Sequence, residues 1–352
     1  MIELFGQPLT AALLGGFGGM LLGLAARLGR FCTLGAIEDM LYGGSGHRMR
    51  MWGLAIGVAI LGSFALAALG FVNIDRAFYL GVSFAWAPAI GGGLLFGYGM
   101  ALAGTCGFGA LARLGGGDLR AFVIVLVMGL TAYAVLSGPL APARMLLFPR
   151  SLNNGPPDGI AHVLAALTGG SVPLIGMGLG LILIVLMLAA RDFRRDLRAV
   201  LWGSVAGLAV VSGWAGTAWL ARNGFGAQTL MSHSYAAPVG ESLLYAMQGS
   251  VRPLSFGIGS VAGVWVGAFV GSLWQGHFRW EACEDPRELR RQIFGAGLMG
   301  AGAVIAMGCT IGQGISAISV LAFSGPITLA SIVAGVAFGL RQLIVGFRSN
   351  PV

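Results

Sequence analysis

Hydrophobic runs of about 20 residues alternate with short polar or glycine-rich stretches along the whole chain. A run of about 20 residues forms a helix long enough to cross the ~30 Å hydrocarbon core of a bilayer. Nine runs are predicted to span a membrane: residues 8–29, 50–72, 88–105, 119–140, 172–190, 198–220, 254–275, 291–308 and 326–346. The pattern therefore predicts an all-α integral membrane protein in which residues 1–352 form a single membrane domain.

Four shorter apolar segments each follow one of these runs and are too short to cross a bilayer. They are residues 31–43, the stretch after Cys106, residues 233–249 and residues 310–323. Apolar segments of about 10–14 residues are typical of re-entrant helices. Irregular backbone at membrane depth is tolerated only inside protein or along a water-filled cavity. The four segments therefore predict short intramembrane helices that line a pathway.

Composition agrees with a chain surrounded by membrane lipid. Hydrophobic residues make up 57% of the chain and charged residues only 10%, with a mean hydropathy of +0.85. A soluble protein of this length would need more charge to cover its surface. The net charge of +8 comes from 21 basic residues, all arginine. These arginines are distributed among many loops, a pattern that does not favour binding to nucleic acid.

The arginine distribution also predicts the orientation of the chain. Loops that follow odd-numbered spans, together with the C-terminal end, carry 16 of the 21 arginines. Because cytoplasmic loops are enriched in basic residues, the N-terminus is predicted to lie outside and the C-terminus in the cytoplasm. The five arginines predicted on the outer side are Arg76, Arg144, Arg150, Arg222 and Arg252.

An internal repeat surrounds three of the four cysteines. Glycine recurs 14 and nine residues before, and three residues after, each of Cys32, Cys106 and Cys309. Coincidence at three offsets in three copies is a poor explanation, even in a chain with 61 glycines. The two preceding glycines are predicted to permit close helix packing, and the following glycine a sharp exit of the backbone.

A fourth copy is obtained by aligning Gly203 with the glycines nine residues before each cysteine, which places Ser212 at the cysteine position. Residues 8–140 then form a first half, residues 172–190 a linking span and residues 198–346 a second half. A single linking span inverts the second half. This is the architecture of many transporters, which bind substrate near the midplane where the halves meet.

The chemistry of the three repeated cysteines leaves several alternatives. A buried cysteine can be a small hydrophobic residue, and three thiolates can bind a soft metal such as Cu(I) or zinc. No histidine or acidic partner accompanies them, so neither a metal nor another cofactor is expected. A thiol is also a weak donor and a polarisable acceptor, which suits a sulfur-containing anion on a neutral route. The predicted substrate-binding residues are Cys32, Cys106, Cys309, Thr105, Thr310 and Gln313.

Two other functional classes fit the pattern less well. A membrane thiol oxidoreductase using Cys32 and Cys106 would be expected to have a C-x-x-C pair or haem-binding histidines within the spans. A purely structural subunit would not need broken helices at membrane depth. The fourth cysteine, Cys283, lies in the acidic stretch "RWEACEDPRELRR". Acidic neighbours disfavour its thiolate, so it is interpreted as incidental, with docking of a carrier protein as the alternative.

The segments "GRFCTLGA", "AGTCGFGALARLGGG" and "GCTIGQGISA" resemble the three cysteine motifs of the YeeE/YedE family of bacterial sulfur-compound transporters. The resemblance implies an hourglass-like inner-membrane protein with nine spans. It also implies a non-enzymatic transporter that takes up thiosulfate or a closely related sulfur anion by transient hydrogen bonds to Cys32, Cys106 and Cys309. The family includes proteins for other sulfur species and for selenium compounds, which stay as alternatives. Its frequent partner, a small cytoplasmic sulfur-carrier protein, would here be a separate polypeptide.

Overall fold

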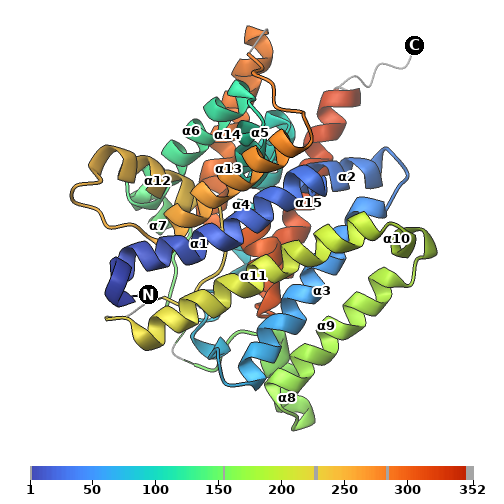
Figure 1. The fold of residues 1–352 in the computed structure, drawn as a ribbon, viewed down its shortest axis with the longest axis vertical. Coiled ribbons are helices and arrows are strands. Elements are labelled where there is room, and N and C mark those ends of the chain that lie inside the picture. Colours follow the sequence, from blue (N-terminus) through green and yellow to red (C-terminus); the bar gives the residue numbers. More distant parts are fainter. Residues whose placement is uncertain (1, 154, 226–228, 283–284, 346–352) are drawn as a thin grey trace.

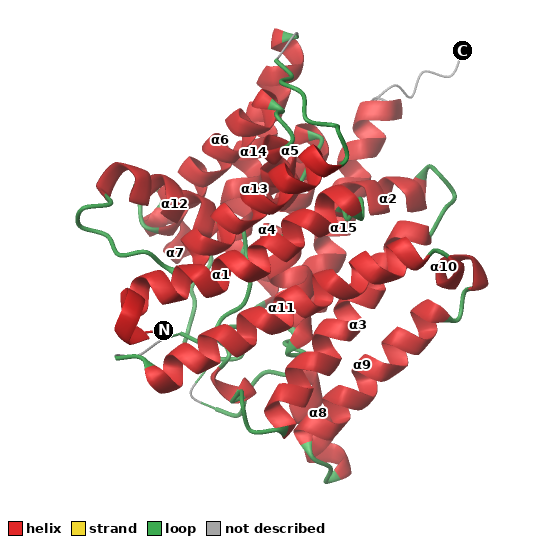
Figure 2. Cartoon of the chain, in the orientation of Figure 1, coloured by secondary structure: helices red, strands yellow, loops and turns green. Residues whose placement is uncertain are grey.

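The computed structural model describes residues 2–153, 155–225, 229–282 and 285–345, and the regular elements in these ranges are helices (Figures 1 and 2). The longer helices are α1 (Ile2–Leu28), α3 (His47–Ala68), α4 (Trp86–Ala103), α6 (Leu119–Leu136), α9 (Val172–Leu188), α11 (Leu197–Asn223), α13 (Phe256–Trp274), α14 (Pro286–Ile305) and α15 (Ser324–Val345). The shorter ones are α2 (Thr33–Leu41), η1 (Ile74–Arg76), α5 (Gly107–Gly115), α7 (Ala141–Leu147), α8 (Ile160–Thr168), α10 (Arg191–Arg195), α12 (Ala237–Gln248) and η2 (Gly312–Ala317). The prediction of an all-α membrane protein is confirmed.

Each predicted span overlaps one of the longer helices, but not every such helix meets the criteria for crossing a bilayer. In the described ranges, seven spans are long and apolar enough, and an eighth is obtained if α8 and α9, which are bent by 116°, count as one. The other predicted span corresponds to α14, whose first turns carry Arg287, Glu288, Arg290 and Arg291. Nine spans therefore stays a prediction.

The long helices α1 and α13 run side by side along a contact lined by glycine (Figure 1). A Cβ atom added to Gly19 would meet the carbonyl oxygen of Ser260, and one added to Gly263 would meet that of Gly16. Each helix therefore occupies the space that side chains would otherwise fill on the other. Small residues repeated at this spacing are characteristic of close helix packing in membranes.

The glycines that precede each cysteine have the predicted packing role at most positions. At five of the six positions a Cβ atom would collide with the backbone of a neighbouring helix or its extension: Gly23, Gly92, Gly97, Gly295 and Gly300. The sixth, Gly18, faces the side chains of His233 and Ser212. The predicted close approach is thus confirmed at the five backbone contacts.

The sharp exit from each long helix lies before the cysteine and not after it. Two residues before the three cysteines, Arg30, Gly104 and Met307 have left-handed backbone, with φ of 55°, 70° and 63°. Such a residue ends a helix by turning the chain away from its axis. The prediction that the following glycines make the exit is wrong, because Gly35 and Gly109 lie within α2 and α5 and have no positive φ.

The alignment of Ser212 with the three cysteines is also wrong. Ser212 lies inside α11, where its hydroxyl donates to the Ala209 carbonyl at 2.7 Å. The helix continues to Asn223, and a loop then leads to α12. A hydroxyl that bonds to the preceding turn is compatible with a continuous helix, so Ser212 does not mark a break.

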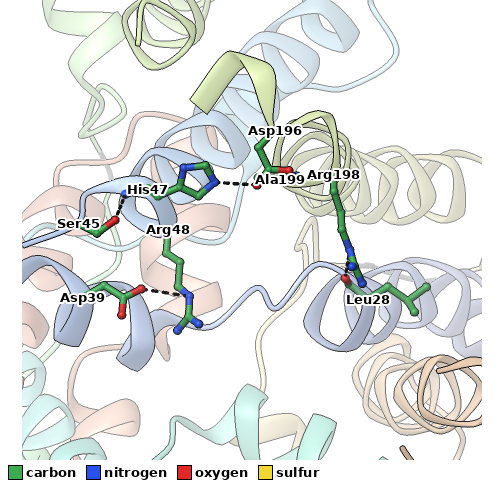
Figure 3. Close-up of polar contacts among 8 residues, drawn as sticks. All are labelled: Leu28, Asp39, Ser45, His47, Arg48, Asp196, Arg198 and Ala199. Carbon is green, nitrogen blue, oxygen red and sulfur yellow. Dashed lines mark hydrogen bonds and ion pairs between the residues drawn. The ribbon is translucent and has the colours of Figure 1, made fainter. Parts of the chain in front are cut away.

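At one end of the molecule, polar contacts join the loops around α2, α3, α10 and α11 (Figure 3). The Arg48 guanidinium pairs with Asp39, with Nε 3.2 Å from Oδ2. The His47 ring lies 2.9 Å from Asp196, measured between Nε2 and Oδ2. Arg198 Nε donates to the last carbonyl of α1 at 2.8 Å. These contacts hold the end of the molecule at which the α2 segment reaches the surface.

Candidate functional site

Each of the three repeated cysteines stands at the beginning of a short helical segment. Cys32 precedes α2, Cys106 precedes α5, and Cys309 precedes the turn that leads into η2. The carbonyl oxygen of each cysteine accepts the amide of the residue four positions later, at 3.1, 2.8 and 2.8 Å respectively. The thiols are therefore placed beside the first, unpaired amides of three segments, where the backbone carries partial positive charge.

Two of the thiols accept hydrogen bonds from backbone amides. Cys106 Sγ accepts from the Gly109 amide at 3.2 Å, and Cys309 Sγ accepts from the Tyr235 amide at 3.4 Å. The Ser234 hydroxyl lies 4.0 Å from Cys309 Sγ, at the limit of a hydrogen bond to sulfur. Both thiols thus have their acceptor capacity engaged and their S–H groups available as weak donors.

The fold brings the three cysteines into one cluster, although they are far apart in the sequence. Cys106 and Cys309 belong to the same hydrophobic core, and Cys32 packs against that core. Cys106 and Cys309 are fully buried, whereas Cys32 is partly exposed. The cluster therefore has one member that can be reached from the surface and two that are enclosed by protein.

Threonine hydroxyls accompany the thiols. Thr105 Oγ1 donates to the Cys106 carbonyl at 3.2 Å. The buried Thr310 hydroxyl approaches the Cys106 thiol and makes no other hydrogen bond, and the buried Thr33 hydroxyl beside Cys32 has no protein partner. A buried hydroxyl without a partner is costly, so these groups are suited to contact a polar species that passes through.

The predicted site residue Gln313 is fully buried and is turned toward the protein. Its Nε2 donates to the Ala306 carbonyl at 2.7 Å, while its Oε1 has no protein partner. The donor of this amide is therefore used to connect η2 to the end of α14. Contact between Gln313 and substrate stays a prediction.

A cavity of about 710 Å³ approaches the cluster from the end at which α1 begins and α6, α11 and α14 end. We call it the Cys309 vestibule, because Ser234, a neighbour of the thiol, and Gly308, the preceding residue, belong to its lining. Its wall is mainly apolar, with hydroxyl groups from Tyr79, Thr217 and Ser260. Such a mixture is typical of sites that bind small ligands.

A buried polar network behind this vestibule was not predicted from the sequence. His233 Nδ1 lies 2.7 Å from Ser260 Oγ, which donates to the Tyr235 hydroxyl at 3.1 Å. His233 lies in the loop between α11 and α12, which is folded into the core, and its ring is fully buried. The polar run "HSY" within an apolar segment was the available signal.

A second cavity of about 220 Å³ lies on the other side of the cluster. It borders Gly104, two residues before Cys106, and is lined by three arginines and two acidic residues: Arg113, Arg120, Arg291, Asp118 and Glu288. The cluster is thus approached by a largely apolar cavity from one end and a strongly polar cavity from the other.

The part of the chain that the structure describes offers no set of side chains arranged as ligands for a metal ion. There, no group of three or more histidine, cysteine, aspartate or glutamate residues is arranged to hold a metal ion. The three cysteines of the cluster are free thiols. Cys283 lies outside the described residues, so its interpretation stays a prediction.

A protein-family model described as "Sulphur transport" matches residues 27–338, a range that contains all three cysteine motifs. The chain belongs to the sulphur transport family. Among other members, the thiosulfate transporter TsuA of Escherichia coli (strain K12) is 26% identical over 336 residues, which cover 90% of each chain. The thiosulfate transporter TsuA of Spirochaeta thermophila is 25% identical over 322 residues, covering 89% of this chain and 93% of that one. This member of the sulphur transport family is a multi-pass membrane protein whose repeated cysteines lie within the matched residues.

Proposed function

We propose that this protein takes up thiosulfate, or a closely related inorganic sulfur anion, across a bacterial inner membrane into the cytoplasm. The ion enters the Cys309 vestibule and passes Cys309, Cys106 and Cys32 in that order. The observation that carries the proposal is the cluster of three free thiols beneath a cavity in a sulphur transport fold. The names of the two TsuA relatives support the choice of thiosulfate.

The chemistry of the cluster suits a soft anion that has to be bound and then released. Each thiol offers a weak S–H donor beside the amides that begin a helical segment, and those amides favour negative charge. A lysine or arginine in direct contact with all three thiols would hold a dianion strongly. Conduction requires binding that is favourable enough for entry but weak enough for exit. Transient thiol hydrogen bonds satisfy both conditions without a covalent step.

Passage requires a movement around the enclosed thiols. Cys106 and Cys309 are fully buried, so the vestibule does not connect freely with the partly exposed Cys32. The backbone is broken directly beside both thiols, at Gly104 and Met307. Breaks of this kind at membrane depth are typical of transporters in which short helical segments move against the longer helices.

Helix packing supports the proposed division into residues 8–140 and 198–346. The first copy of the first half contains α1 and α3: α1 packs against α11 and α13, and α3 packs against α11. The second copy contains α4 and α6: α4 packs against α14 and α15, and α6 packs against α14. Each copy in one half thus has a matching neighbour in the other. The linking helix α9 packs against α3 at the edge of the bundle (Figure 1).

The remaining parts of the proposal follow from the same arrangement. The N-terminus and the Cys309 vestibule face the outside, because the arginine-rich loops belong on the cytoplasmic side. The protein transports the ion unchanged and is not an enzyme. A small cytoplasmic sulfur-carrier protein, where one participates, receives the ion on the arginine-rich side. Other inorganic sulfur anions and selenium analogues are the alternative substrates.

The proposal is tested by growth and uptake in a bacterial host that lacks its own sulfur-anion transporters. We expect the protein to permit growth on thiosulfate as sole sulfur source and to import labelled thiosulfate. Unlabelled sulfite, sulfate, sulfide and selenium analogues, added one at a time as competitors, identify the preferred species. Absence of thiosulfate uptake above the empty-vector level, with the protein present in the membrane fraction, would contradict the proposal.

A further inference from the structure

Among the described residues that line the Cys309 vestibule, Arg150 is the one basic residue and Glu241 the one carboxylic acid. Arg150 belongs to the loop between α7 and α8, and Glu241 belongs to α12. The two side chains do not form an ion pair with each other or with another residue in the described ranges. The vestibule therefore holds an arginine that is not ion-paired with a carboxylate in the described part of the chain.

The position of Arg150 is fixed by the end of α14. Its terminal nitrogen donates to the Val304 carbonyl and, at 2.9 Å, to the Ile305 carbonyl. These are the last carbonyls of the helix that leads to Cys309, so the guanidinium is held at the base of the vestibule. Its Nε atom is buried and has no protein partner. Part of the planar donor group is thus left without an acceptor.

The guanidinium stays charged in this setting. Burial, and after it the nearby Arg144, lowers the pKa of Arg150 to about 10, which still leaves the group protonated at neutral pH. A protonated guanidinium that lines a cavity and has no ion-pair partner binds oxyanions well, because its planar donors match the spacing of their oxygens.

We propose that Arg150 forms an anion-binding subsite at the base of the vestibule, which binds the oxygen atoms of a divalent tetrahedral sulfur anion before its terminal sulfur reaches Cys309. This inference rests on the proposed function and names a residue that determines its specificity. The arginine attracts a dianion to the thiols, and it selects against neutral sulfur compounds that the thiols alone would accept. The Arg150 guanidinium also places the oxygen atoms of the substrate beside the end of α14, four residues before Cys309.

The chain offers a matched control in Arg144. Its Nε donates to the Val135 carbonyl at 3.1 Å and another nitrogen approaches the Leu136 carbonyl at 3.5 Å, so Arg144 caps the end of α6 as Arg150 caps the end of α14. Arg144 does not belong to the lining of the vestibule. Replacing either arginine removes one positive charge and one set of helix-end contacts, but only Arg150 would touch the anion.

The experiment measures anion binding by calorimetry on the purified protein, with sodium thiosulfate and sodium sulfate as probes. Loss of one charge-assisted contact in Arg150→Gln is expected to weaken thiosulfate binding about tenfold, with Arg144→Gln within about twofold of the wild type. Arg150→Lys, which keeps the charge but loses the planar donors, is expected to fall between them. Glu241→Gln is expected to strengthen binding, because it removes the opposing charge.

Three results would overturn the subsite: unchanged binding in Arg150→Gln, equal weakening in both arginine variants, or no anion binding by the wild-type protein. Melting temperature and elution profile are recorded for each variant, and Arg150→Lys replaces Arg150→Gln in the comparison if the latter unfolds. Because the experiment measures binding and not transport, a failure of the Arg150 subsite can be distinguished from a failure of the proposed uptake. Wild-type protein that binds thiosulfate but does not import it would contradict only the proposed uptake.

Discussion

Cys106 is enclosed on all sides and has two close polar neighbours, the Gly109 amide and the Thr310 hydroxyl. Packing alone would accept alanine or serine here, since both are close to cysteine in size. What they lack is a soft sulfur atom that donates and accepts weakly. The role of this residue is therefore separable from its volume.

For that reason Cys106→Ala and Cys106→Ser are both expected to fold and to lose most thiosulfate uptake. Alanine leaves a void of one atom, which costs about 1 kcal/mol of folding free energy. Serine fills it with a harder, more strongly hydrated oxygen. Uptake into vesicles is normalised to folded protein by size-exclusion chromatography. Cys283→Ala serves as the control and should transport normally. Near-wild-type rates in both Cys106 variants would contradict a role for the thiol in transport.

At the scale of elements, the close packing of α1 against α13 depends on the glycines that line their contact. Gly19 lies where a Cβ atom would meet the Ser260 carbonyl of the opposite helix. The helices therefore cannot keep their separation if a methyl group is added. Ser260 also belongs to the network behind the vestibule, so a shift of α13 would reach the site.

Gly19→Ala is accordingly expected to lower the melting temperature or to prevent folding. Gly178→Ala is the matched control, because a Cβ atom at Gly178 in α9 would meet no atom within 4 Å. There the helix propensity of alanine should stabilise the protein by about 0.5–1 kcal/mol. Thermal unfolding of the detergent-solubilised proteins makes the comparison. Equal melting temperatures for both variants would argue against close packing between α1 and α13.

The N-terminus of α11 is stabilised by a capping side chain. Asp196 caps this helix by accepting the Ala199 amide at 3.1 Å, and it contacts His47 (Figure 3). The hydrogen bond from Ala199, and after it the contact with His47, hold the pKa of Asp196 below its usual range. A carboxyl group with a lowered folded-state pKa stabilises the fold above its unfolded pKa and loses that effect as the pH falls through the folded one.

Asp196→Ala is expected to cost about 1 kcal/mol of stability at neutral pH, the usual value for a lost helix cap. The gap in melting temperature between variant and wild type should narrow as the pH falls below about 4, the unfolded-state pKa of an aspartate, and should be lost once the folded-state carboxylate is protonated. Asp192→Ala, at an exposed position in α10, is the control. A gap that does not change with pH would show that the charge of Asp196 is unimportant.

For the molecule as a whole, the orientation in the membrane determines which of the two cavities faces the outside and which faces the cytoplasm. The vestibule and the exposed residue Ser151 belong to the end predicted to lie outside, whereas segments 113–118 and 191–198, which contain one and four arginines, belong to the end predicted to lie in the cytoplasm. Uptake from outside to inside requires this orientation and not its reverse.

Labelling with a membrane-impermeant thiol reagent in intact spheroplasts tests the orientation. Ser151→Cys is expected to react from outside, whereas Asp192→Cys is expected to react only after the membrane is opened. Each is compared with the unsubstituted protein, which gives the background from the natural cysteines. Labelling of Asp192→Cys in intact spheroplasts would reverse the predicted topology and would direct the vestibule toward the cytoplasm.

The membrane-spanning helices could be predicted from the sequence because the hydrophobic length that a bilayer requires is a local property of the chain. The same holds for the glycines that precede each cysteine, since their spacing is visible without any fold. The helix breaks were predicted near the right residues but with the wrong cause, because only Gly104 of the three left-handed residues is a glycine. Arg30 and Met307 give no local signal for that conformation.

The site was therefore only half visible in the sequence. The three cysteines could be named from the repeat, but their relative positions depend on how the longer helices hold α2, α5 and η2, with α3 and α15 each packing against both α2 and η2. The burial of His233 and the position of Arg150 at the end of α14 were also decided by tertiary structure. Spans and repeats follow from forces that act on neighbouring residues, whereas a cavity wall is formed by whichever distant side chains the packed helices bring to it.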